Sequence, residues 1–209
     1  MKYWIKTPTF IQCVFFRMRW RFSSSHPNIY LTFDDGPSSF VTENILDILK
    51  EEGVKATFFC IGENVIKNPI LFNEILKAGH SIGNHSMTHP NGWKVNKGFY
   101  MEDINKAAQI INSNLFRPPF GRFNFRSLSI LKKTFQIIMW DVVSGDFDIK
   151  LKPEKIINNV VKNARNGSII VMHDNDKFKD LTLSSLLPII KGLKKKGFCF
   201  KPIPFSPLV

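Results

Sequence analysis

The sequence predicts an α/β protein whose parallel sheet curls into a distorted (β/α)7 barrel, with helices on the outside. Short apolar runs alternate repeatedly with segments of helical period. The runs are almost continuously apolar, which is typical of parallel strands that helices cover. Polar residues end several different runs, and such residues converge only if the sheet closes. In an open sheet they would spread along one edge instead.

The expected strands are rich in β-branched and aromatic residues. They cover residues 29–33, 56–62, 81–85, 115–119, 136–142, 168–174 and 198–203. The expected helices lie between them, at 42–53, 68–79, 101–114, 127–134, 153–167 and 183–197. Pro69 and Pro153 stand near helix starts, and Gly53 and Gly167 stand at helix ends, where each residue type is favoured.

The first 25 residues differ from the rest, so we expect a basic, aromatic arm at 1–25 and one domain at 26–209. The apolar stretch from Phe10 to Phe16 contains Gln12 and is shorter than a membrane span. No small-residue cleavage site follows it. There is thus no clear signal peptide or transmembrane helix, and we expect the arm to pack on the domain or to lie on a membrane surface. A degenerate signal peptide is the alternative.

The formal net charge is +12. Such a balance favours an anionic partner, namely nucleic acid, lipid headgroups or an acidic polymer, unless it is only a solvated surface. No recognisable motif organises the charge for nucleic-acid binding, so we expect no specific nucleic-acid partner.

The three cysteines, Cys13, Cys60 and Cys199, form no C-x-x-C pair. Cys60 and Cys199 lie in apolar runs, which predicts reduced, buried thiols. A disulfide framework is not expected.

Two motifs at strand ends together predict a metal site. In "HSMTH", the rings of His85 and His89 face one way if the strand gives way to a helical turn. In "TFDDGP", Asp34 and Asp35 stand side by side, where like charges repel unless a cation intervenes. If the first and third strands are neighbours, one carboxylate completes a His, His, Asp set with an open position. Each motif alone is unspecific, because Asp-Asp-Gly is also a common turn.

Four motifs in this order, "TFDDGP", "HSMTHP", "RPPFG" and "VMHD", resemble those of the polysaccharide deacetylases, carbohydrate esterase family 4 or the NodB homology domain. The resemblance runs from about residue 29 to 203. It implies a TIM-like distorted β/α barrel with seven strands, in agreement with the strand count. It also implies that 26–209 is a catalytic domain that hydrolyses N-acetyl groups of a glycan, such as peptidoglycan or a chitin-like N-acetylglucosamine polymer or oligomer.

By this resemblance, Asp35, His85 and His89 would bind a divalent metal, most often zinc. Cobalt or nickel would also suit these ligands. The metal would polarise the acetyl carbonyl and lower the pKa of a bound water.

The resemblance also assigns the proton transfers. Asp34 would be the general base, and Arg117 would hold and orient it. His173 would be the general acid, and Asp146 would orient it. The backbone N–H of Phe120, where the family usually has tyrosine, would help to stabilise the oxyanion.

The fourth family motif, D-x-x-D-W, is altered here to "VSGDF", with Val143 for the first acid and Phe147 for the tryptophan. Asp146 aligns with the acid that supports the histidine, and Asp141 is an alternative partner. Two other functions remain open. One keeps the site but changes the substrate, as an O-acetyl esterase on a xylan-like polysaccharide or an amidase on a small non-glycan molecule. The other is a catalytically weak carbohydrate-binding homologue.

Aromatic residues offer a groove for sugars, because aromatic faces stack on pyranose rings. Trp93 and Trp140 are candidates with Phe120, although Trp140 ends an apolar strand and is expected to be half in the core. The remaining polar candidates are Thr32 and Asn84 as supports for the ligands, and His26 and His80 as loop or packing residues.

The expected partners are an N-acetylated carbohydrate polymer or oligomer and an anionic cell-wall or membrane surface. We expect a monomer. The location stays open between the bacterial cell envelope and the cytoplasm.

Overall fold

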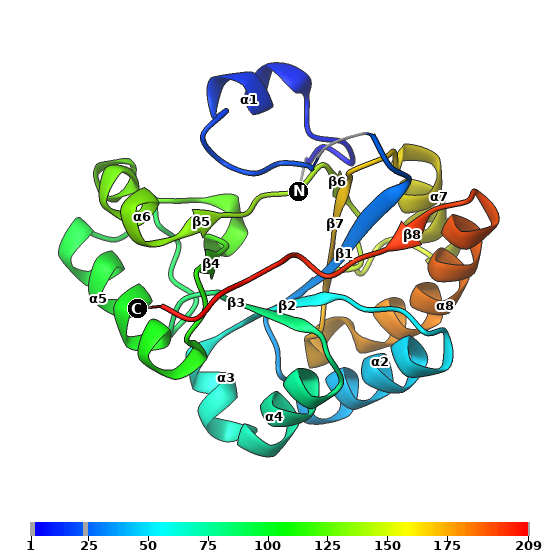
Figure 1. The fold of residues 1–209 in the computed structure, drawn as a ribbon, viewed down its shortest axis with the longest axis horizontal. Coiled ribbons are helices and arrows are strands. Elements are labelled where there is room, and N and C mark those ends of the chain that lie inside the picture. The colour runs from blue at the N-terminus through cyan, green and yellow to red at the C-terminus, as the bar shows by residue number, and fades with distance from the viewer. Residues whose placement is uncertain (1–2, 23–24, 209) are drawn as a thin grey trace.

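The computed structural model describes residues 3–22 and 25–208, and a curled parallel sheet forms its centre (Figure 1). Seven strands follow in the order β5-β4-β3-β2-β1-β7-β6, and β8 pairs with the start of β1. The strands are β1 (Asn28–Asp34), β2 (Thr57–Cys60), β3 (Ser81–Asn84), β4 (Leu115–Phe116), β5 (Gln136–Ile137), β6 (Val142–Val143), β7 (Ile169–His173) and β8 (Cys199–Phe200). The predicted distorted barrel is confirmed as a curled half-barrel.

Helices surround the sheet (Figure 1). They are α2 (Ser39–Glu51), α3 (Gly62–Lys67), α4 (Pro69–Lys77), α5 (Lys97–Ile111), α6 (Leu128–Thr134), α7 (Pro153–Asn163) and α8 (Lys179–Lys195), with α1 (Thr9–Val14) before the first strand. Three short 3-10 turns cover Pro119–Gly121, Phe125–Ser127 and Asp176–Phe178. Every expected helix is present, and α1 and α3 are additional. Pro69 and Pro153 each stand at a helix start, where their fixed φ is favourable.

Side-chain alternation along β1 builds both the core and the polar interior. Ile29 and Phe33 are fully buried in the hydrophobic cluster that the sheet forms with α2 and α8. Thr32 and Asp34 take the opposite face, where the guanidinium of Arg117 contacts both. One face of β1 therefore fixes the sheet to its helices, while the other presents polar groups to the barrel interior.

The strand expected at 136–142 is interrupted, so that prediction was wrong in part. Its first residues form β5 beside β4, and its end passes into β6 beside β7. Between them, Ile138 and Met139 pair with Arg19 near the N-terminus. A single apolar run thus supplies both edges of the open sheet, and the chain must bend between them.

Residues 3–22, here called the N-terminal segment, pack against this part of the sheet (Figure 1). Met18 and Trp20 are buried with Phe116 and Leu131 in a second hydrophobic cluster. Among the residues that the structure describes, no helix is both long enough and apolar enough to cross a bilayer.

The cysteines are all free. Cys60 is buried on β2 as expected, but Cys199 is exposed, so the prediction of a second buried thiol was wrong. Cys199 lies on β8, a two-residue strand that pairs only with the start of β1, and Cys199 is exposed there.

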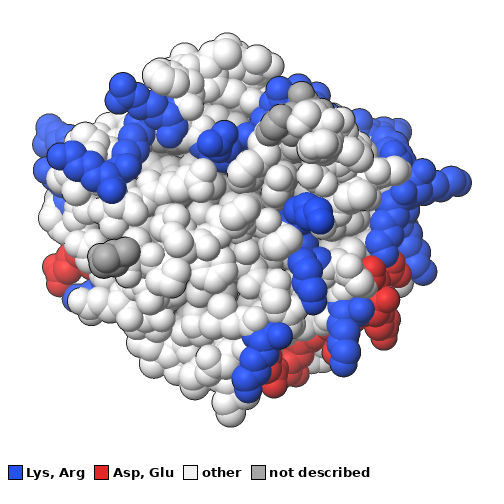
Figure 2. Space-filling view, viewed as in Figure 1, with Lys and Arg blue, Asp and Glu red and all other residues white. Residues whose placement is uncertain are grey.

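The C-terminal segment crosses the barrel at the amino ends of the strands, in front of the sheet in Figure 1. Ile203 donates its N–H to Thr57 at the start of β2, and Ser206 accepts from Asn114 just before β4. Figure 2 shows the molecule from this side, where Lys and Arg side chains lie mostly around the periphery rather than in one central patch.

Candidate active site

The two adjacent carboxylates stand at the carboxyl end of β1. Asp34 is the last residue of the strand, and Asp35 begins the loop with a left-handed φ of 84°. Backbone contacts hold this loop, because Asp35 donates its N–H to Phe59 and accepts from the Asn64 side-chain amide. The turn sends the two side chains in different directions, so that they meet different partners.

The two histidines follow β3 in an irregular turn and not in the helical turn that the spacing suggested. Ser86 and His89 both have positive φ, at 69° and 59°. The Asn84 side chain accepts from the N–H of Ser86, and the Ser86 hydroxyl accepts from the N–H of His89. These bonds fold the turn back, so that the rings of His85 and His89 lie with centroids 5.0 Å apart.

Asp35 joins the two imidazoles. Its Oδ1 lies 3.6 Å from Nε2 of His85 and 3.2 Å from Nε2 of His89, and the three donor groups lie within 4.8 Å of one another. Burial alone would raise the pKa of Asp35, but the hydrogen bond with His89 and the nearby imidazoles hold it below its usual value. These three predicted ligands therefore do converge.

The donor set fits a divalent metal. Nδ1 of His85 lies 2.8 Å from the carbonyl oxygen of Arg117, and a proton on Nδ1 would leave Nε2 free as a ligand. Burial lowers the pKa of His85 to about 4, so the ring is neutral at pH 7. Two imidazoles with one carboxylate are the ligand types that zinc and related ions accept in catalytic sites.

Asp34 turns away from this cluster toward Arg117, which is fully buried. Nη1 of Arg117 lies 2.6 Å from Oδ1 of Asp34 and 2.7 Å from the Thr32 hydroxyl. The other guanidinium nitrogens donate to the carbonyls of Ile138 and Met139. The guanidinium is therefore fixed on several sides, and it holds the Asp34 carboxylate in one orientation.

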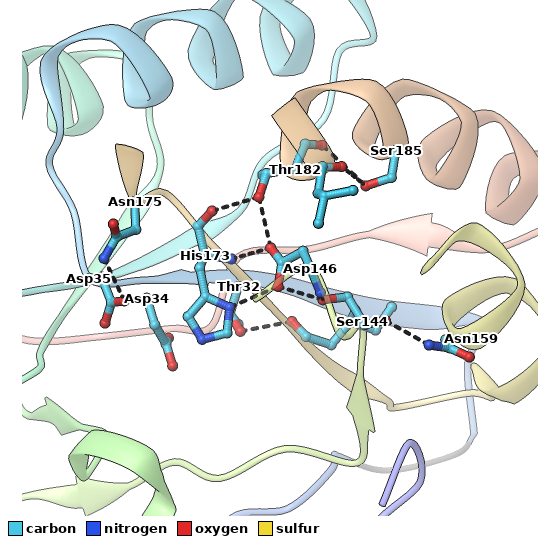
Figure 3. Close-up of polar contacts among 12 residues, drawn as sticks. Thr32, Asp34, Asp35, Ser144, Asp146, Asn159, His173, Asn175, Thr182 and Ser185 are labelled. Atoms are coloured by element: carbon cyan, nitrogen blue, oxygen red, sulfur yellow. Dashed lines mark hydrogen bonds and ion pairs between the residues drawn. The ribbon is translucent and has the colours of Figure 1, made fainter. Parts of the chain in front are cut away.

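His173 ends β7, beside Asp34 on β1. Its Nδ1 lies 2.8 Å from Oδ1 of Asp146, and its backbone N–H donates to Oδ2 of the same carboxylate at 2.7 Å. Burial lowers the pKa of His173, but the charges of Asp146, Asp35 and Asp34 and the hydrogen bond with Asp146 together raise it more, and the result is about 9. Figure 3 shows the imidazole between Asp146 on one side and the pair Asp34 and Asp35 on the other.

Asp141, the alternative partner for His173, lies elsewhere. Its carboxylate pairs with Arg165 at 2.9 Å and accepts from Ser168 and Gln12. Asp146 is instead held by Ser144 and Thr182, whose hydroxyls donate to its two oxygens (Figure 3).

One cleft of about 870 Å³ is lined by Asp34, Asp35, His85, His89 and His173. Phe120 and Trp140 line it, and the Phe120 ring lies 4.5 Å from that of His89. Trp93 does not line it, contrary to expectation. Its ring lies under the guanidinium of Arg122 at 4.8 Å and borders a smaller neighbouring pocket.

Sequence reasoning missed several supporting residues. Asp174 accepts from the N–H of Gly36 at 2.9 Å and from the Thr42 hydroxyl at 2.7 Å, so it ties the loop after β1 to α2. The Asn175 amide donates to Oδ2 of Asp35 at 3.1 Å (Figure 3). Both residues directly follow His173 at the end of β7, and this position at a strand end could have identified them from the sequence.

Of the two supports named from the sequence, Asn84 holds the turn between the predicted ligands, whereas Thr32 contacts Arg117 and not a predicted ligand. His80 is a packing residue that accepts from the N–H of Ala56, and His26 is exposed.

The geometry is that of a metal-dependent hydrolase, and the comparisons with known proteins agree. Residues 23–135 match the family model for polysaccharide deacetylases, and the chain belongs to this family.

Relatives are found over most of the chain. A peptidoglycan-N-acetylglucosamine deacetylase of Bacillus cereus is 35% identical over 188 residues, covering 87% of this chain and 88% of its own. A chitooligosaccharide deacetylase of Azorhizobium caulinodans is 31% identical and covers 88% of this chain and 96% of its own. A crystal structure of a peptidoglycan N-acetylglucosamine deacetylase superposes with a TM-score of 0.87 at 35% identity, over 95% of both chains.

Proposed function

We propose that this protein is a metal-dependent hydrolase that removes N-acetyl groups from a glycan of N-acetylglucosamine, either peptidoglycan or a chitin-like polymer or oligomer. The observation that carries the proposal is that the His, His, Asp set, Asp34 and His173 line one cleft. Arg117 pairs with Asp34, and Asp146 pairs with His173. The names of the two relatives support the glycan class.

Asp35, His85 and His89 would hold the metal. Zinc is the ion we propose, because two imidazoles, a carboxylate and an open position suit it, while cobalt and nickel accept the same ligands. The ion supplies polarisation of the acetyl carbonyl and a lowered pKa for the attacking water.

The remaining steps belong to side chains of this protein. In the proposed reaction Asp34 accepts a proton from the water as it attacks the carbonyl carbon, while Arg117 keeps the carboxylate oriented. The N–H of Phe120 donates to the developing oxyanion. His173, with its pKa of about 9, gives its proton to the amide nitrogen as the carbon–nitrogen bond breaks. The products are acetate and a free amine on the sugar.

The direct test measures acetate released from chitopentaose and from peptidoglycan by the purified chain. We expect activity that a chelator abolishes and that added zinc restores. Asp34→Asn should lower kcat by roughly 100-fold or more. The matched control is Asp47→Asn, an exposed aspartate on α2, which should behave as the wild type.

Activity that ignores both chelation and Asp34→Asn would refute the mechanism. Acetate release from acetylated xylan, but not from either N-acetylated substrate, would identify an O-acetyl esterase. Elemental analysis of the purified protein identifies the ion.

We further propose that the protein binds an anionic cell-wall polymer through its basic surface. The net charge of +12 favours such a surface. Binding of the chain to cell-wall preparations should weaken steeply with salt, and binding that does not change with salt would contradict this proposal.

A further inference from the structure

The N-terminal segment closes the gap between β5 and β6 (Figure 1). Arg19 donates its N–H to Ile137 at 2.8 Å on one side of the gap. On the other side, Val143 donates to Ile5 at 2.8 Å and Thr7 donates to the carbonyl of Asp141 at 2.9 Å. Because both ends of the segment pair with the sheet, its path over the barrel is fixed.

This path brings the segment to the cleft. Tyr3, Trp4, Ile11 and Trp20 line the same cavity as Asp34, Asp35, His89 and His173. The segment therefore forms one wall of the candidate active site. Nothing in the proposed reaction uses this wall.

The side chains of this wall are not equivalent. Trp20 is 8% exposed and donates its indole N–H to the carbonyl of Phe15, so it serves the core. Trp4, by contrast, is 60% exposed although it borders the cavity, and its ring meets the edge of Phe10. An indole held at a cavity wall with its surface open to water offers an apolar face to a ligand.

Tyr3 connects the wall to the proton donor. Its ring lies 4.9 Å from that of Phe147, and its hydroxyl donates to Asp148 at 3.3 Å. Phe147 in turn lies edge-on to His173, with ring centroids 5.2 Å apart. Tyr3 thereby fixes the start of the segment beside the reacting groups, and Trp4 is the next residue along the chain.

The size of the cleft leaves room for more than the reacting group. Its volume of about 870 Å³ lies near the upper end of the roughly 300–1,000 Å³ that drug-sized ligands occupy. A sugar whose acetyl group reaches Asp34 and His173 would leave part of the aromatic wall free for its neighbour in the polymer.

We propose that Trp4 is a sugar-stacking subsite, which binds a pyranose ring next to the one that loses its acetyl group. The inference rests on the proposed glycan substrate and adds a specificity-determining residue from outside the four family motifs. The segment then favours an oligomer over a single sugar, because only an oligomer has a second ring to stack on Trp4.

The test compares three variants of the full, zinc-loaded chain on chitopentaose. Trp4→Ala should raise KM about tenfold and change kcat less, since Trp4 makes no hydrogen bond or ring contact with Asp34, Asp35 or His173. Trp4→Phe, which keeps an aromatic face, should restore most of the affinity. Phe16→Ala is the matched control, because Phe16 is an aromatic residue of the same segment, 73% exposed, that does not line the cleft.

Calorimetric binding of chitopentaose to the same variants gives a readout that does not need turnover. A Kd raised about tenfold in Trp4→Ala but not in Phe16→Ala supports the subsite. Equal KM and Kd values in the two variants, or a lower kcat at unchanged KM, would overturn it. If the proposed function itself is wrong, the wild-type protein will release no acetate from chitopentaose, whether or not it binds the pentamer.

Discussion

At the scale of single residues, the protonation of His173 is the property that the fold controls most directly. Burial lowers its pKa, yet Asp146 bonds both its Nδ1 and its backbone N–H, and the charges of Asp35 and Asp34 add to the effect, so the pKa rises to about 9. A raised pKa means that the protonated ring persists through neutral pH and is lost only as the pH passes that value. His173 must be in this protonated form to donate a proton to the departing amine.

Replacement of Asp146 tests this control. Asp146→Asn removes the largest charge that raises the pKa of His173, so the alkaline limb of the kcat profile should move to lower pH by roughly one unit or more. Acetate release measured between pH 6 and 10 gives the profile. Asp180→Asn, an exposed aspartate at the start of α8, serves as the control. An unmoved alkaline limb in Asp146→Asn would show that His173 does not set it.

At the scale of elements, the loops after the strands carry the unusual backbone. Asp35, Ser86, His89 and Phe120 all have φ between 58° and 84°, although none is glycine. Such conformations cost on the order of 1–3 kcal/mol each and persist where the surroundings hold them. Here all four lie at or beside the candidate site, so the strain is concentrated where side chains must point inward together.

The loop after β1 offers the sharpest test of this rigidity. An added Cβ on Gly36 would lie 1.8 Å from Oδ2 of Asp174, which is buried and holds the loop. Gly36→Ala should therefore displace Asp174 or the loop and lower the free energy of unfolding by about 1–3 kcal/mol. It should also lower kcat, because Asp35 is the preceding residue. Urea unfolding and acetate release measure the two effects.

The control is Gly98→Ala in the first turn of α5. There the nearest atom to an added Cβ is the Asn96 side-chain oxygen at 3.4 Å, so the change should be neutral or stabilise the protein by at most about 1 kcal/mol. If both alanine variants unfold at the same urea concentration, the loop after β1 is not rigid in the way the contacts indicate.

The elements also show how far sequence reasoning reaches. Apolar runs and strand-end polar residues predicted the sheet, and His85, His89 and Asp35 do meet. Periodicity could not predict that the run at 136–142 divides between two edges, since that depends on Arg19, far away in sequence. The prediction that Trp93 lines the cleft was wrong for a similar reason, because its ring packs under the guanidinium of Arg122, which belongs to another loop. Contacts between distant loops leave no periodic signal.

At the scale of the whole molecule, metal binding should be linked to global stability. A ligand present at 1,000 times its Kd that binds only the folded state stabilises it by about 4 kcal/mol. We expect zinc to raise Tm in the wild type and a chelator to reverse the rise. His85→Ala lowers stability by itself, so the quantity to compare is the zinc-dependent shift in Tm, which should vanish in this variant. An equal shift in both proteins would place the ion elsewhere.

The barrel as a whole depends on its N-terminal segment, because β5 and β6 do not pair with each other. In a chain that begins at residue 25, the N–H groups of Met139 and Val143 lose their acceptors, and the surface that packed on buried Trp20 is uncovered. We expect a loss of about 3 kcal/mol or more in the free energy of unfolding, by comparison with the cost of removing a buried tryptophan side chain. The urea midpoint measures it, with Phe16→Ala as the control that changes only an exposed side chain of the same segment. A shortened chain with the midpoint of the full one would mean that the rest of the sheet is stable with its gap open, and that the segment serves the cleft alone.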